Sequence, residues 1–288
     1  MRSIVNLLRD FFRSLFSSGT LSDDACCTRY PIILIHGIAF RDDAVLSSWG
    51  SVPDRIEEKG GRVFLSGAEA WATYEENAAL LAGQVERVLE ETGSEKVNLI
   101  AHSKGGLDAR YAISKLGLAA KVASLTTVST PHRGTTPADI MCGLAPDEEN
   151  ILYKLADLYG KLLGDRSPDT ATAIQQLTRD HMKQFNDEIQ DADGVYYQSY
   201  GSHMLSGFND PIFALTHEIL NRHEGANDGM VSEASYRWGE FQGVVKGKIN
   251  GIGISHLQVT GAAGPIISNI NIPTLYAGWI SQLKKKGF

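Results

Sequence analysis

Short apolar runs alternate along the chain with longer amphipathic stretches. The runs that predict strands are 31–35, 62–65, 97–101, 122–128 and 195–200. The stretches that predict helices between them are 48–59, 73–91 and 107–116. Continuous β-branched runs that alternate with helices are typical of repeated βαβ units around a buried parallel sheet. The pattern therefore predicts an α/β fold with a mainly parallel, doubly wound sheet.

The alternation stops after Gly134, and only helical patterns occur from 135 to 193, notably over 151–163 and 170–189. The first of these carries a wide apolar stripe, formed by Ile151, Leu152, Leu155, Leu158, Tyr159, Leu162 and Leu163. Such a stripe fits a helix packed on the core, or a lid that exposes apolar surface when it opens. We expect an inserted helical cap over about 135–193.

The first 16 residues carry eight large apolar side chains at nearly helical spacing, with Arg2, Arg9 and Arg13 between them. Charges interrupt the apolar run too often for a cleavable signal peptide, and the run is too short for a transmembrane helix. We expect an amphipathic helix and linker over 1–24, before a domain over 25–288. The helix would pack on protein or lie on a lipid surface. Because the segment reads as neither a cleavable signal peptide nor a transmembrane helix, we expect a cytoplasmic or peripheral-membrane location.

Composition argues against a nucleic-acid-binding surface and against a cysteine-based disulfide or metal site. The chain of 288 residues has 27 Lys and Arg against 34 Asp and Glu, a net charge of −7, so a general nucleic-acid-binding surface is not expected. Its three cysteines, Cys26, Cys27 and Cys142, form neither a disulfide framework nor a metal-binding spacing. We expect no bound cofactor.

The most informative stretch is Ala101-His102-Ser103-Lys104-Gly105-Gly106, between a predicted strand and a predicted helix. A serine on a sharp strand-to-helix turn exposes its hydroxyl, and the positions two before and two after must be small because strand and helix pass closely. Ala101 and Gly105 meet that condition. Ser103 is therefore the candidate nucleophile.

A serine nucleophile needs a base within hydrogen-bond reach and a carboxylate that orients the base. On this topology the acid and then the histidine follow the serine. Position leaves His203 and His256 among eight histidines, and the glycine-rich loop around His256 favours that residue as the base. Asp228, in an Asn-Asp-Gly turn between serine and histidine, is the candidate acid, although such turns also occur without any catalytic role.

Acyl transfer also needs two backbone donors for the oxyanion of the tetrahedral intermediate. One should be the amide of Lys104, directly after the nucleophile. The other should come from the loop after the first strand, where Gly37 allows the backbone to approach the substrate and Ile38 follows.

Four motifs in this order resemble the bacterial true lipases, which are triacylglycerol lipases of the α/β-hydrolase fold. The motifs are Tyr30 to Gly37, Val97 to Tyr111, Ser129 to Gly134 and Asn227-Asp228-Gly229. The resemblance implies a carboxylic ester hydrolase with a mobile lid and a preference for long acyl chains. It assigns nucleophile, acid and base to Ser103, Asp228 and His256.

Two departures from the family pattern matter. Ala101 and Lys104 replace the glycine and glutamine that the elbow usually has, and Lys104 adds a charge near the site. Many members bind a calcium ion that braces the histidine loop. Asp210 could match one ligand position, but Gln258 stands at the other and is a poorer ligand for a hard cation. We therefore expect no metal.

The predicted function is ester hydrolysis, as a triacylglycerol lipase or esterase, through a covalent acyl-enzyme on Ser103. An acyltransferase with the same triad, or a non-catalytic lipid-binding module, are the alternatives. The expected partners are a lipid or ester substrate and, through residues 1–16, a membrane or lipid-droplet interface. The sequence does not indicate an oligomeric state.

Overall fold

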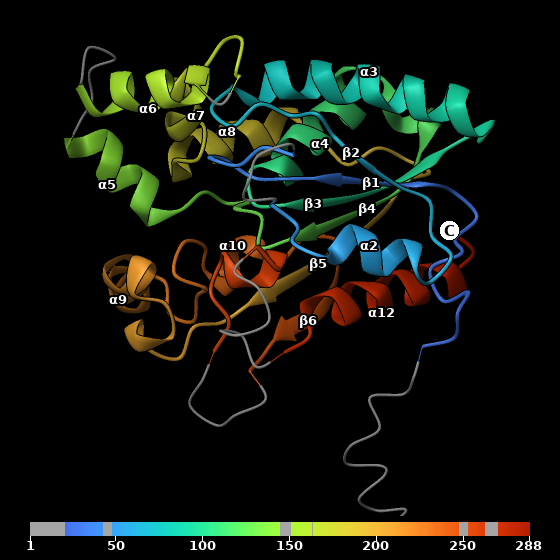
Figure 1. Ribbon diagram of the computed structural model, residues 1–288. Coiled ribbons are helices and arrows are strands. Elements are labelled where there is room, and N and C mark those ends of the chain that lie inside the picture. Colours follow the sequence, from blue (N-terminus) through green and yellow to red (C-terminus); the bar gives the residue numbers. More distant parts are fainter. Residues whose placement is uncertain (1–20, 43–47, 145–150, 163, 248–252, 263–269) are drawn as a thin grey trace, which may run out of the picture.

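The computed structural model describes residues 21–42, 48–144, 151–162, 164–247, 253–262 and 270–288 (Figure 1). Within these residues six strands form one sheet in the order β2-β1-β3-β4-β5-β6. The strands are β1 (Ile32–Ile35), β2 (Val63–Leu65), β3 (Val97–His102), β4 (Val122–Val128), β5 (Tyr196–Ser202) and β6 (Glu240–Val245). All neighbouring strands pair in parallel. The predicted α/β fold with a parallel sheet is confirmed.

Helices cover both faces of the sheet. Ile32 and Leu34 of β1 pack into one hydrophobic core, whereas Ile33 and Ile35 pack into the other, as the alternation of side chains along a strand requires. The helices on the first face are α2 (Val52–Glu57) and α12 (Ile272–Lys285), and those on the second are α3 (Tyr74–Thr92) and α4 (Gly105–Lys115) (Figure 1). Burial on both faces explains why the strands are continuous apolar runs.

Helices alone connect β4 to β5 in the described residues. They are α5 (Thr136–Leu144), α6 (Ile151–Leu162), α7 (Thr170–Gln175) and α8 (Arg179–Glu188), which lie together beyond the sheet (Figure 1). The predicted single helix over 170–189 is wrong. It breaks where the Gln176 side chain accepts a hydrogen bond from the Tyr74 amide at 2.9 Å and where Thr178 caps α8. That these helices act as a lid stays a prediction.

The remaining helical elements lie directly before β4 and in the segments that follow β5 and β6. They are η1 (Leu118–Lys121), η2 (Gly207–Asn209), η3 (Pro211–Phe213), α9 (Ala214–His223), α10 (Glu233–Tyr236) and η4 (Gln258–Thr260). The predicted helix over 48–59 is shorter than expected, and the predicted amphipathic helix over 1–16 lies outside the described residues. No helix in the described ranges is long and apolar enough to cross a membrane.

Candidate active site

Ser103 lies on the sharp turn between β3 and α4. Its φ angle is +52°, in the left-handed region that a residue with a side chain rarely adopts. The turn brings strand and helix so close that a Cβ atom on Gly105 would clash with the His36 carbonyl oxygen and lie 2.9 Å from a methyl of Ile35. The small residue predicted at position 105 is therefore required by packing, and the turn presents the Ser103 hydroxyl at the end of the sheet.

A chain of hydrogen bonds joins the three predicted triad residues. His256 Nε2 lies 2.9 Å from Ser103 Oγ, and His256 Nδ1 lies 2.9 Å from Asp228 Oδ2. Asp228 comes from the turn after α9, and His256 comes from the loop before η4. The three side chains are brought together from segments up to 153 residues apart. Ser103 is 6% exposed and His256 is 8% exposed, so the site is shielded from water.

Asp228 is fully buried and is held as an acceptor. Its Oδ1 accepts hydrogen bonds from the amides of Met230 at 3.0 Å and Val231 at 2.8 Å, which leaves Oδ2 for the imidazole. The backbone closes the arrangement, because the His256 amide donates to the Asp228 carbonyl at 2.8 Å. The carboxylate therefore fixes the ring with its proton on Nδ1 and its lone pair on Nε2 toward the serine.

The other histidines have different surroundings. His203, the alternative base, lies with Nε2 at 2.9 Å from Glu233 Oε2, so its ring faces that carboxylate. His102 directs Nε2 to the His256 carbonyl at 3.0 Å. Burial and the neighbouring His256 hold the pKa of His102 well below its usual range. His102 is therefore neutral, and its hydrogen bond to the His256 carbonyl helps to hold His256 in place.

The loop after β1 passes beside the nucleophile. A Cβ atom on Gly37 would lie 2.7 Å from the Ser103 Cβ, so only glycine allows this approach. Ile38 follows directly, and the Ala39 amide donates to the Ala70 carbonyl at 2.9 Å, which fixes the course of the loop. The amides of Ile38 and Lys104 thus belong to two segments that meet at Ser103.

Sequence reasoning missed the partner of Lys104. The Lys104 ammonium is buried and donates to Asp108 Oδ1 at 2.7 Å. Burial raises the pKa of the Asp108 carboxyl, an effect that the Lys104 charge opposes. The i,i+4 spacing of Lys104, the residue directly before α4, and Asp108 in the first turn of α4 could have indicated the pair.

The residues at the possible calcium position do not fit a cation. Asp210 Oδ2 accepts a hydrogen bond from Ser255 Oγ at 2.7 Å, and the Gln258 side-chain amide donates to the Asn209 carbonyl at 3.1 Å. Gln258 Oε1 accepts from the Ser255 amide at 3.1 Å. A hydrogen-bond donor thus stands where a metal would need a ligand. The described residues contain no group of three or more His, Cys, Asp or Glu side chains that could hold a metal ion.

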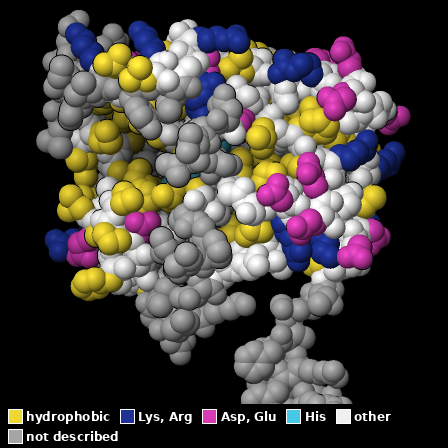
Figure 2. Space-filling model, in the orientation of Figure 1, with side chains coloured by type: hydrophobic (Ala, Val, Ile, Leu, Met, Phe, Trp, Pro, Cys, Tyr) yellow, Lys and Arg dark blue, Asp and Glu magenta, His cyan; other side chains and the backbone are white. Residues whose placement is uncertain are grey.

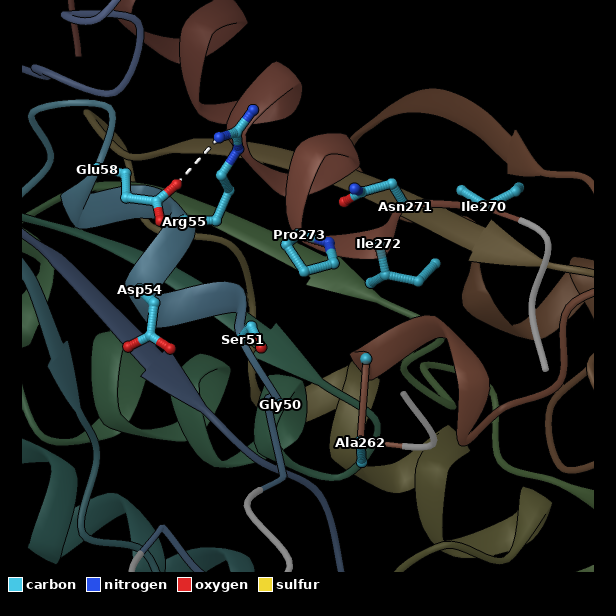
Figure 3. A pocket seen from close by; sticks show the side chains of 11 residues that line it. Gly50, Ser51, Asp54, Arg55, Glu58, Ala262, Ile270, Asn271, Ile272 and Pro273 are labelled. Carbon is cyan, nitrogen blue, oxygen red and sulfur yellow. Dashed lines mark hydrogen bonds and ion pairs between the residues drawn. The ribbon is translucent and has the colours of Figure 1, made fainter. Parts of the chain in front are cut away.

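A cavity of about 530 Å³ lies between α2 and the start of α12 (Figure 3). Asp54, Arg55 and Glu58 line one side of it, and Arg55 donates to Glu58 at 3.0 Å. The three triad residues are not among those that line it. This charged cavity is therefore distinct from the site around Ser103.

The sequence model of the family described as palmitoyl protein thioesterase matches residues 31–192, more than half of the chain. The chain belongs to this family. The matched segment contains the turn of Ser103 and the loop of Gly37. It ends before Asp228 and His256.

Curated relatives of this family member are lipases. It is 32% identical over 206 residues to triacylglycerol lipase 2 of Saccharomyces cerevisiae. The alignment covers 69% of this chain and 59% of the yeast protein. The chain thus spans less than two thirds of the yeast protein's length. It is 28% identical over 287 residues to a triacylglycerol lipase of Vibrio cholerae, with 90% and 89% of the two chains covered.

Solved structures agree on the fold. A carboxyl esterase of metagenomic origin matches with a TM-score of 0.71 at 18% identity, over 90% of this chain and 76% of the esterase. The Staphylococcus hyicus lipase matches with a TM-score of 0.65 at 17% identity, over 90% and 97%. The predicted α/β-hydrolase fold and the resemblance to bacterial lipases are confirmed. The curated relatives and solved structures that this chain resembles are lipases and esterases.

Proposed function

We propose that this chain hydrolyses carboxylic esters of long acyl chains, with Ser103 as nucleophile, His256 as general base and Asp228 as the residue that orients the base. The observation that carries the proposal is the pair of 2.9 Å contacts that joins the serine oxygen, the imidazole and the carboxylate. The contact between Ser103 Oγ and His256 Nε2 has the length at which a proton passes from a hydroxyl to an imidazole.

The reaction would proceed in two halves. Ser103 Oγ attacks the carbonyl carbon, and its proton moves to His256 Nε2. The amides of Ile38 and Lys104 stabilise the oxyanion that forms. His256 then returns the proton to the leaving alkoxide, which leaves an acyl group on Ser103. A water molecule, deprotonated by His256, then attacks the acyl group, and Ser103 leaves as the carboxylic acid is released. Asp228 stabilises the imidazolium that forms in each half.

An apolar rim beside the histidine loop supports long-chain substrates. It consists of the exposed side chains of Leu205, Phe208, Ile212 and Leu215. The exposed fractions are 96% for Phe208 and 75% for Ile212, and Phe213 of the same segment packs edge-on to the His256 ring. Figure 2 shows hydrophobic side chains on the side where α5 and α9 lie, around a hollow. Clustered apolar side chains of this size mark an interaction surface, which we assign to the lipid that carries the substrate.

The lysines near the C-terminus offer little unpaired charge for contact with a lipid surface. Two of the three lysines at 284–286 are paired within the protein, Lys284 with Asp24 at 2.8 Å and Lys286 with Glu240 at 3.0 Å. The interface proposed for residues 1–16 lies outside the described residues. We therefore attribute lipid contact first to the apolar rim.

Two variants test the nucleophile and the rim separately. Ser103→Ala should abolish hydrolysis of p-nitrophenyl octanoate and labelling by a fluorophosphonate while the melting temperature is retained. Phe208→Ser should lower activity on emulsified long-chain esters but leave soluble short esters unaffected. Leu116→Ser is the matched control, because Leu116 is 43% exposed at the far end of α4. Full activity of Ser103→Ala, or equal effects of the two surface variants, would contradict the proposal.

The family description favours a second substrate class, the palmitoyl thioester. The same serine chemistry cleaves oxygen esters and thioesters, so a comparison of palmitoyl thioester with palmitoyl oxygen ester at equal concentration decides between them. Products formed with an added acceptor alcohol would reveal acyl transfer, and absence of fluorophosphonate labelling would favour a non-catalytic lipid-binding module.

A further inference from the structure

The residue after the nucleophile carries a buried charge that the oxyanion amide does not need. Any residue at position 104 would supply the same backbone N–H, and an apolar side chain would avoid the desolvation of an ammonium. Instead Lys104 is 1% exposed, and so is its partner Asp108. A buried ion pair of this kind contributes little net stability, so we ask whether its other contacts give it a role in fixing a geometry.

Asp108 is also bound from the neighbouring helix. Asn77 of α3 donates from Nδ2 to Asp108 Oδ2 at 3.2 Å. The same Asn77 side chain also makes two hydrogen bonds to the backbone of Glu69. Its Oδ1 accepts from the Glu69 amide at 2.8 Å, and its Nδ2 donates to the Glu69 carbonyl at 3.0 Å. Asn77 is 3% exposed. Asp108 and Asn77 therefore link Lys104 to the segment after β2.

The segment after β2 in turn holds the loop that follows β1. The Ala70 carbonyl accepts the Ala39 amide at 2.9 Å, and the Ala68 carbonyl lies 3.1 Å from His36 Nε2. These contacts stand on either side of Ile38, the residue assigned the second oxyanion donor. A continuous path of buried polar contacts thus runs from one donor segment to the other.

We propose that Lys104, Asp108 and Asn77 form a positioning brace that fixes the spacing of the two oxyanion donors. The inference rests on the proposed function, since it assumes that the amides of Lys104 and Ile38 bind the oxyanion. The brace touches no reacting atom through its side chains. It acts by preventing the two donor segments from shifting relative to each other, and oxyanion stabilisation depends on donors held in place before charge develops.

The test compares two buried asparagines. Asn77→Ala removes the middle of the brace. Asn98→Ala is the matched control, because Asn98 is also buried and bonds Ser124 Oγ at 2.7 Å and the Tyr30 carbonyl at 3.3 Å, at the opposite end of β3. Rates are expressed per active site titrated with a fluorophosphonate, so unfolded protein does not count. The readouts are kcat, KM and the affinity for an alkyl boronic acid, which forms a tetrahedral anion on the serine.

We expect Asn77→Ala to lower kcat and the boronic acid affinity in parallel, by about tenfold to a hundredfold, with KM changed less than about twofold. Asn98→Ala should leave all three within about twofold. Equal effects of the two variants on kcat would overturn the brace. Failure of the proposed function would be recognised separately, because then wild-type protein would not be labelled or Ser103→Ala would stay active.

A double variant separates positioning from folding. Lys104→Met with Asp108→Leu removes both charges and restores apolar packing, so the melting temperature should recover relative to either single variant. The kcat per labelled site should stay reduced, because the connection to Asn77 is still absent. Wild-type kcat in the double variant would show that the ion pair serves stability alone and would overturn the proposal.

Discussion

Replacement of Asp228 by asparagine should disable the base without disturbing the fold. Asp228 Oδ1 accepts two backbone amides, from Met230 and Val231, and the carbonyl oxygen of an asparagine would keep those two bonds. Its NH2 group would then face His256 Nδ1, which must become the acceptor. The ring proton moves to Nε2, where it points at Ser103 Oγ, and the imidazole can no longer take the serine proton.

The expected loss in kcat is about 10⁴, the magnitude associated with the wrong tautomer in a serine triad. It corresponds to about 5.5 kcal/mol in the activation free energy. Hydrolysis of p-nitrophenyl octanoate and the rate of fluorophosphonate labelling measure it, and circular dichroism melting confirms that the variant is folded.

Asp169→Asn is the control for this substitution. Asp169 caps α7 by accepting the Thr172 amide at 3.1 Å, and asparagine is an equally good cap. That variant should retain wild-type kcat. If Asp228→Asn keeps more than about a tenth of the activity and labels at the wild-type rate, Asp228 does not set the tautomer and the assigned acid is wrong.

Three further predictions concern stability and metal dependence. Burial holds the pKa of His132 well below its usual range, so below about pH 6.5 the unfolded chain takes up a proton that the folded chain refuses. Stability should fall by about 1.4 kcal/mol per pH unit for this histidine, and urea denaturation of His132→Gln should show a shallower fall between pH 7 and 5. Removal of divalent cations by EDTA should leave the melting temperature and activity unchanged, and a melting temperature lowered by EDTA would contradict the expectation that no metal is bound. Gln258→Ala should cost about 1–3 kcal/mol of folding stability through its lost hydrogen bonds. Gly105→Ala should destabilise by about 1–3 kcal/mol through overpacking. Gly83→Ala, whose added Cβ would lie 3.9 Å from the Arg87 guanidinium in ordinary van der Waals contact, should be neutral or stabilising in chemical denaturation.

The edge strand shows where sequence patterns fail. β6 was not predicted, because its residues are mostly half-exposed and Gly243 interrupts them with a φ of +131°. It forms because β5 offers a free edge, an event that depends on a distant partner. The break between α7 and α8 has the same origin, since Gln176 bonds to the start of α3. Local propensity does not contain such long-range contacts.

The sequence by itself determined the central strands and the turn of Ser103, and it identified Asp228 and His256 as the candidate acid and base. Buried parallel strands need continuous apolar runs, and the turn needs small residues at fixed positions, so both leave a local signature. The tertiary structure alone decided that Gln258 and Asp210 are bound by hydrogen bonds and that Lys104 is paired inside the protein. It also decided which apolar side chains stay exposed. Those outcomes depend on which groups meet in three dimensions, because the free energy of a buried charge or a donor is set by its partner.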